Sequence, residues 1–195
     1  MRGQREFSEL LKDYPKEIIL KDGTGVTLRP LKVGDEEALF KMFSRLSVDD
    51  LWFLNQDVSD PRRIAEWINN LDPSRVISIV GLMEGRIVGN AVLMMKRHGA
   101  KSHIGKVRIS VDPGFRDRRL GTWMLLDLVN LSIEMGLQML VMRLVQDRDA
   151  SIIKSVRKLD FTEEAVLKDY LMGGEGQAHN LVIMIKRLPM ACYDS

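Results

Sequence analysis

The chain of 195 residues contains one cysteine, Cys192, which lies close to the C-terminal end. A lone thiol cannot form an intramolecular disulfide, and it cannot build a metal site made of several thiolates. No histidine lies near Cys192 in the sequence, so the neighbour that commonly activates a cysteine is also missing. The shortage of cysteine favours a reducing compartment, and we expect the protein to be cytoplasmic.

Long apolar runs and an excess of one charge are also missing. Residues 1–17 are polar and charged and do not resemble a signal peptide, and no segment approaches the ~20 apolar residues that cross a bilayer. The 29 basic and 27 acidic side chains leave a net charge of +2. Because no overall field attracts nucleic acid or an anionic membrane, we expect neither as a partner.

Metal-ligand patterns are absent from the sequence as well. His98 and His103 are near each other, but no cluster of His, Asp or Glu has the spacing of metal ligands. We therefore predict no metal site.

The apolar content is sufficient for one buried core, since 45% of the residues are hydrophobic. We expect a single domain over residues 1–195, with residues 1–17 as an N-terminal appendage. The spacing of Phe7, Leu10 and Leu11 allows one or two helical turns in that appendage.

Apolar periodicity predicts strands and helices that alternate along an α/β (α+β) chain. Strands are expected over residues 18–20, 26–30, 76–82, 87–95, 104–111, 139–145, 165–171 and 180–186. Helices are expected from a cap at Asp35 to about Ser47, from Pro61 to about Ile68, and over residues 120–135 and 150–159. The segment 48–58 is expected to be a loop that exposes Trp52 and Phe53.

The expected strand over residues 104–111 has two different faces. Its residues alternate, with Val107, Ile109 and Val111 on one face and Lys106, Arg108 and Ser110 on the other. We expect the polar face to meet the substrate.

The segment VDPGFRDRRLGTWML, at residues 111–125, indicates an anion site. An apolar strand ends there, an arginine-rich turn follows, and a long helix begins, so free N–H groups and the positive end of the helix dipole coincide with three guanidinium groups. Gly121 lets the backbone approach a phosphate, and Thr122 adds a hydroxyl donor. Taken alone, such a basic run is more often a solvated loop; the surrounding strand and helix favour the anion site.

This pattern resembles the acyl-CoA motif of the GNAT acetyltransferase superfamily: Arg or Gln, two residues, Gly, one residue, then Gly or Ala. The likeness extends from about residue 19 to residue 188. VTLRPLKVGDEEALFKMF is similar to the family's first strand and helix, and DASIIKSVRKLDF is similar to its fourth helix. The resemblance implies a mixed, mostly antiparallel sheet of six to seven strands flanked by about four helices.

Within that superfamily, DGTGVTLRPL and HNLVIMIKRL are most similar to the branch related to bacterial protein lysine acetyltransferases. The resemblance implies acetyl-CoA as cosubstrate. Homodimers are common in the family, so a homodimer is a further expectation.

The resemblance also implies which residues hold the donor. Val111 offers its backbone to the pantetheine arm, and the residues after it form the pyrophosphate cradle. The cradle consists of Arg116, Asp117, Arg118, Arg119, Leu120, Gly121 and Thr122. Asp149 stands where the family often has an Asn that binds the pantetheine, and Ile152 and Ser155 line the arm.

The sequence departs from the family pattern at three positions. Arg119 replaces the first Gly of the motif, so the backbone there has to adopt a conformation that a non-Gly residue tolerates, or shift its grip on the phosphate. Val156 stands where many relatives carry a Tyr acid, and Lys106 stands where the lysine-acetylating branch places a Glu base. The catalytic residues are therefore not identified from the sequence.

Several other side chains are candidates for the acceptor side. Trp52, Phe53 and Tyr170 line an acceptor pocket or, equally well, pack as core. Each histidine alone is more often ordinary surface; His179, at the end of a glycine-rich loop, is the one whose position best suits a base.

The sequence thus favours an N-acetyltransferase that acts on a primary amine, in a small molecule or a protein lysine, by direct attack in a ternary complex. One alternative is a catalytically silent acyl-CoA-binding regulatory or scaffolding module, which fits the missing Tyr and Glu. Another is a phosphate-binding α/β domain for a different nucleotide, although the GxxxxGK[ST] and GxGxxG patterns are absent.

Overall fold

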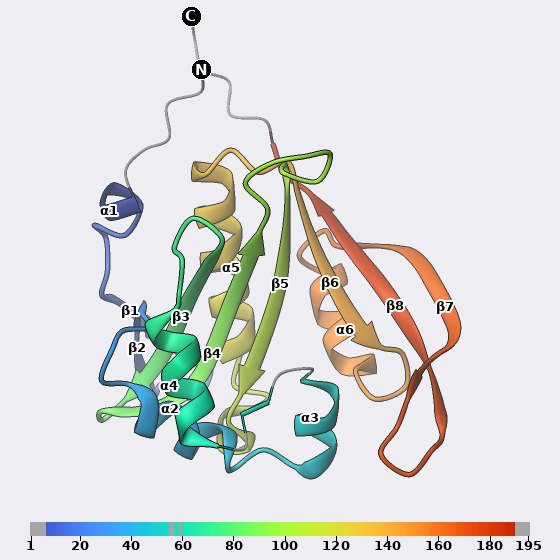
Figure 1. The fold of residues 1–195 in the computed structure, drawn as a ribbon, viewed down its shortest axis with the longest axis horizontal. Helices are drawn as coiled ribbons and strands as arrows, with labels where there is room; N and C mark the ends of the chain where they lie inside the picture. The colour runs from blue at the N-terminus through green and yellow to red at the C-terminus, as the bar shows by residue number, and fades with distance from the viewer. Residues whose placement is uncertain (1–6, 55–56, 59, 190–195) are drawn as a thin grey trace, which may run out of the picture.

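The computed structural model describes residues 7–54, 57–58 and 60–189 and contains one eight-stranded sheet with helices on both faces (Figure 1). The strand order is β1-β2-β3-β4-β5-β6-β8-β7. The strands are β1 Lys16–Ile19, β2 Gly25–Pro30, β3 Val76–Met83, β4 Arg86–Met95, β5 Ile104–Val111, β6 Met139–Val145, β7 Thr162–Met172 and β8 Ala178–Arg187. The helices are α1 Phe7–Leu10, α2 Glu36–Phe43, α3 Val48–Phe53, α4 Pro61–Asn69, α5 Leu120–Glu134 and α6 Ala150–Arg157, with a 3₁₀ turn, η1, at Pro113–Phe115.

The mixed α/β fold is confirmed, with one strand more than the family resemblance implied. The short strand β1 pairs antiparallel with β2 at the sheet edge and supplies the additional strand. The only parallel pair among the described strands is β5 with β6.

The expected loop over residues 48–58 is wrong in its first half, which forms the helix α3. A capping box starts this helix: the amide of Asp50 donates to Ser47 Oγ at 3.0 Å, and the amide of Ser47 donates to Asp50 Oδ2 at 3.2 Å. None of the six residues of α3 is buried. Its apolar residues Val48, Leu51 and Trp52 have helical spacing, but only Leu51 packs against an apolar cluster, so the capping box is the clearer signal in the sequence.

Two apolar clusters cover opposite faces of the sheet. The larger cluster joins the strands to α5 and α6, and the smaller one joins α2 and α4 to Val80 and Ile87. In β5, Val107 belongs to the cluster with α5, so the alternation places Lys106 and Arg108 on the other face.

The described part of the N-terminal segment, residues 7–17, packs against the body. Leu10 is buried, and Tyr14 donates a hydrogen bond to Asp127 of α5. Lys16, in β1, pairs with the same carboxylate at 2.7 Å.

Strands β5 and β6 pair over three positions and then separate. The paired residues are Ile104 with Met139, Gly105 with Leu140 and Lys106 with Val141. Beyond them β6 continues beside β8 as far as Val145, so residues 107–111 of β5 have no strand on this side. Figure 1 shows the two strands together at one end of the sheet and apart at the end near α3.

Gly105 sits where the two strands are still joined. A Cβ atom added to it would lie 2.7 Å from Leu93, 2.8 Å from Leu140 and 3.0 Å from Leu137. All three leucines are buried, so they cannot all withdraw. The absence of a side chain at this position lets β5 and β6 meet over the core.

The substitution Gly105→Ala should lower the free energy of unfolding by about 1–3 kcal/mol, because it overpacks three buried leucines. Denaturant unfolding measures the change. Gly25→Ala is the matched control in a strand, since a Cβ there meets nothing within 4 Å. Equal stabilities of the two variants would contradict the role given to Gly105.

Candidate functional site

The separation of β5 and β6 leaves a split between the two halves of the sheet, which we call the cleft, and a helix begins after the end of each strand. Strand β5 leads through η1 into α5, and β6 leads through a short turn into α6. The positive ends of both helix dipoles therefore lie at the open end of the cleft. The helix α3 lies at that end of the sheet, between its two halves (Figure 1).

The turn after β5 is fixed by a buried carboxylate, Asp112. Its oxygens accept hydrogen bonds from Arg45 at 2.5 Å, from Arg86 at 3.0 Å and from the amide of Gly114 at 2.9 Å. Burial opposes ionisation, but the bonds from Arg86, Gly114 and Arg45 outweigh it and lower the pKa of Asp112. Sequence reasoning missed this support, because Arg45 and Arg86 are remote in the chain.

Residues 116–122 form a turn with two left-handed backbone positions, Asp117 at φ 59° and Arg119 at φ 71°. Arg119 thus keeps the conformation that suits a glycine, which costs a non-Gly residue roughly 1–2 kcal/mol. The first helical bond of α5 joins Trp123 N–H to Arg119 O at 3.0 Å. The preceding amides, from Leu120 to Thr122, are therefore available to an anion.

The guanidinium groups of this turn are held by acids from other elements. Arg116 pairs with Asp50 of α3 at 2.7 Å, and Arg118 pairs with Asp22 at 2.9 Å. Arg119 is exposed at the start of α5. Any anion that binds Arg116 or Arg118 must compete with a carboxylate.

The other residues that were predicted to bind acetyl-CoA lie on both walls of the cleft. A Cβ on Gly121 would meet Val111 at 3.6 Å, so the strand end and the helix start are in contact. Leu120 has its side chain in the core, which leaves only its backbone for a ligand. On the opposite wall Asp149 precedes α6, and Ile152 and Ser155 are exposed on that helix.

Asp149 is a buried carboxylate at the end of β6. Its Oδ2 accepts the amide of Val145 at 2.8 Å, and Oδ1 lies 3.2 Å from Arg148. Burial raises the pKa of Asp149, and these two contacts only partly oppose it. The carboxyl group therefore fixes the turn between β6 and α6, although its burial costs free energy of desolvation.

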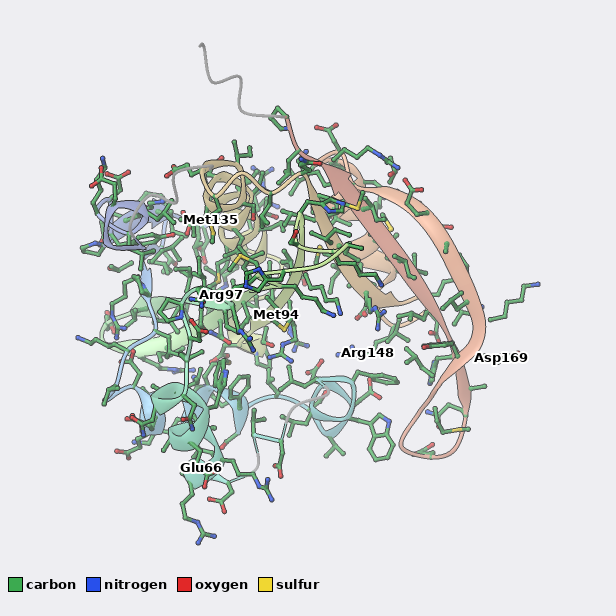
Figure 2. The ribbon with its side chains drawn as sticks, turned by 45° about the horizontal axis from the view of Figure 1, so that its top comes forward. Glu66, Met94, Arg97, Met135, Arg148 and Asp169 are labelled. Atoms are coloured by element: carbon green, nitrogen blue, oxygen red, sulfur yellow. The ribbon has the colours of Figure 1, made fainter. Side chains whose placement is uncertain are left out.

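One carboxylate of α3 joins the two walls. Asp50 pairs with Arg116, which follows β5, and its second oxygen accepts a hydrogen bond from Arg148, which follows β6. Figure 2 shows Arg148 between the two halves of the sheet, near α3. Burial opposes ionisation of Asp50, but bonds from Arg116, Ser47 and Arg148 lower its pKa to about 2. Sequence reasoning missed Asp50 and Arg148.

The face of the sheet that carries α3 also holds the acceptor candidates. Trp52 is 54% exposed and donates Nε1–H to Met172 O at 2.7 Å, while Phe53 packs between His179 and Arg148. Arg108 of β5 donates to Leu54 O at 2.9 Å. Tyr170 is exposed on β7.

The structure also places the two residues that stand where relatives carry an acid or a base. Lys106 is exposed on β5, and Val156 is a residue of α6 whose side chain is buried in the core. The valine supplies no acid, and position 106 holds a lysine in place of a carboxylate.

The model of the acetyltransferase (GNAT) family matches residues 41–161, more than half of the chain. This chain belongs to the GNAT family. Family membership supports acetyl transfer in general, with acetyl-CoA as the cosubstrate. No curated protein matches its sequence.

Solved structures share the fold of this GNAT protein at low identity. A putative acetyltransferase from Salmonella typhimurium, yncA, determined with acetyl-CoA, has a TM-score of 0.73 and 17% identity over 87% of this chain and 98% of its own. The GNAT domain of S. lividans PAT has a TM-score of 0.71 and 15% identity over 89% and 96%. The ribosomal-protein-S18-alanine N-acetyltransferase from Escherichia coli has a TM-score of 0.68 and 18% identity over 87% and 98%.

The described residues of this GNAT protein fit acetyl-CoA. Residues 107–111 of β5, which no described strand pairs on this side, could present backbone groups to an extended amide-bearing arm, and the turn after them could present helix amides and arginines to a diphosphate. The carbonyl of Val111 accepts a hydrogen bond from Arg116 Nε at 3.3 Å. No helix in the described ranges is both long and apolar enough to span a bilayer.

The substitution Asp149→Asn should stabilise the protein at neutral pH by on the order of 1 kcal/mol. A raised carboxyl pKa means that the native state holds its proton more tightly, so wild-type stability falls as the pH rises from the unfolded pKa through the folded one. The asparagine keeps the acceptor for Val145 and carries no charge.

Unfolding by urea at several pH values measures this difference. The difference in stability between Asp149→Asn and the wild type should be small below about pH 4, the ordinary range of an aspartate pKa. It should reach a plateau above the pKa of Asp149 in the folded state. Asp169→Asn, at an exposed position, is the control. A gain in stability that is largest at acidic pH would contradict a raised pKa of Asp149.

Proposed function

We propose that the chain is an N-acetyltransferase that moves the acetyl group of acetyl-CoA to a primary amine by direct attack in a ternary complex. The observation that carries the proposal is the split between β5 and β6, with a free strand edge that ends in the arginine cradle. The edge and cradle suit the donor, and the face that carries α3 remains for the acceptor. A small-molecule amine and a protein lysine are the acceptor classes.

In this proposal the donor is held by the residues predicted from the family motif. Val111 contributes its backbone at the end of the strand. The diphosphate is held by Arg116, Asp117, Arg118, Arg119, Leu120, Gly121 and Thr122. The far wall is formed by Asp149, Ile152 and Ser155. The resemblance of DGTGVTLRPL and HNLVIMIKRL to the branch related to bacterial protein lysine acetyltransferases supports a protein lysine as one acceptor. A single domain over residues 1–195, a cytoplasmic location and a homodimer stay predictions.

The second candidate is a catalytically silent acyl-CoA-binding module. The buried Val156, in place of an acid, and the exposed Lys106, in place of a base, favour it. Release of CoA thiol from acetyl-CoA, followed over a panel of polyamines, amino acids and lysine peptides, separates the two. Turnover of any amine supports the enzyme, whereas tight acetyl-CoA binding with no turnover across the panel supports the silent module.

The substitution Arg116→Glu should weaken acetyl-CoA binding by roughly tenfold or more, because repulsion replaces a charge-assisted phosphate contact. Titration calorimetry measures the dissociation constant. Arg62→Glu, at an exposed position of α4, makes the same charge change as a control. Equal affinities of the two variants would overturn the assignment of the cradle.

The substitution Asp50→Asn should tighten acetyl-CoA binding several-fold, because it frees Arg116 from a competing carboxylate. Asp49→Asn is the matched control on the same helix, since Asp49 pairs with Arg148 at 2.9 Å and not with Arg116. If the Asp50 variant binds no tighter than the Asp49 variant, Asp50 does not compete with the donor.

A further inference from the structure

Among the buried side-chain nitrogens and oxygens of the described residues, Nε2 of His179 is the one without a hydrogen-bond partner. Buried polar atoms are nearly always paired, because an unpaired one costs about 1–3 kcal/mol. The exposed fraction of the His179 side chain is 13%. This unpaired imidazole nitrogen, in a ring that contacts Phe53 of α3, is therefore a candidate functional group.

The other ring nitrogen of His179 is fixed by a carboxylate. Nδ1 lies 3.1 Å from both oxygens of Asp147, which follows β6. The hydrogen bond with His179 lowers the pKa of Asp147, so the carboxylate stays ionised and accepts. The proton of the neutral ring then resides on Nδ1, and Nε2 carries the lone pair of a base.

His179 lies on the acceptor face of the cleft. Its ring meets the ring of Phe53 edge-on, with centroids 5.4 Å apart. The next residue, Leu54, accepts a hydrogen bond from Arg108, which projects from the polar face of β5. The end of α3 therefore links His179 to the polar face of β5. This face of the sheet is opposite to the one that α5 covers.

The helix α3 lies against His179 and is held mainly by polar contacts. None of its residues is fully buried, and Leu51 is its one residue that packs, partly buried, against the smaller apolar cluster. Its polar contacts go to Arg116, Arg148 and Met172 O. A diphosphate on Arg116 would remove one of these contacts, and a shift of α3 that exposes Nε2 would then cost little more than the contact of Leu51.

We propose that His179, oriented by Asp147, is the general base that takes a proton from the acceptor ammonium; this rests on the proposed N-acetyltransferase function. The ammonium gives one proton to Nε2, and the free amine nitrogen forms a bond to the thioester carbonyl carbon. The C–S bond then breaks, and the second amine proton passes to the departing thiolate. The imidazolium returns its proton to water past Asp147, whose side chain is 67% exposed.

Several charged groups set the electrostatics of this imidazole. Asp147 touches it, and Arg148 stacks on the other side of Phe53 at 5.3 Å. Asp49 and Asp50, on α3, are both paired with Arg148. Glu175, in the β7–β8 hairpin, is exposed.

The test uses the full chain with acetyl-CoA and, as acceptor, spermidine or a lysine peptide, whichever is acetylated faster. His179→Gln should lower kcat by about 10²–10⁴-fold with little change in acetyl-CoA affinity. The acidic limb of the kcat/KM pH profile should disappear with it. Asp147→Asn, at an exposed position, should keep the fold and lower kcat by a smaller factor, because the ring loses its tautomer preference.

His98→Gln, in an exposed loop, is the control and should match the wild type. If spermidine and the peptide are acetylated but His179→Gln and Asp147→Asn keep the wild-type kcat and pH profile, His179 is not the base and the proposed function stands. If wild-type protein binds acetyl-CoA but acetylates neither acceptor, the proposed function fails for these amines and the base assignment falls with it.

Discussion

The site depends on one feature of the sheet, the separation of β5 from β6 after the pair Lys106 and Val141. Before that point Gly105 lets the strands meet over three buried leucines. After it, β6 remains with β8, and no described strand pairs with β5 on that side. A strand edge with unpaired backbone groups binds extended polar chains, which is the shape of a pantetheine arm.

The electrostatics of the cleft follow from that separation. Because each strand is followed by a helix, two positive helix ends and several arginines gather at the open end. In the described part of the chain these charges are balanced by carboxylates of other elements, Asp50 and Asp22. The same ion pairs hold α3 across the cleft, so donor binding and the position of α3 are coupled through Arg116.

Most of the fold could be predicted from the sequence, because it rests on local apolar patterns. Strands β5 and β6 were predicted with their observed bounds, since both are uninterrupted apolar or alternating runs. The cradle was predicted from the order of strand, basic turn and helix. The helix α3 was not predicted, because its six residues give a single repeat of apolar positions, Val48, Leu51 and Trp52, and none of them is buried.

The contacts that complete the site could not be predicted in the same way. Asp50 lies 66 residues from Arg116 and 98 from Arg148, and Asp147 lies 32 residues from His179. Surface acids and bases are frequent in this chain, and spacing alone does not select which of them meet. His179 was considered as a candidate base; its partner Asp147 and its unpaired Nε2 emerge only in three dimensions.

We infer that acetyl-CoA occupies the split between β5 and β6 and competes with α3 for Arg116. This can be tested by amide hydrogen exchange of the wild-type protein with and without acetyl-CoA. We expect slower exchange over residues 107–111 and 117–122 and faster exchange over α3, residues 48–53. Unchanged exchange along β5 under saturating acetyl-CoA would contradict it.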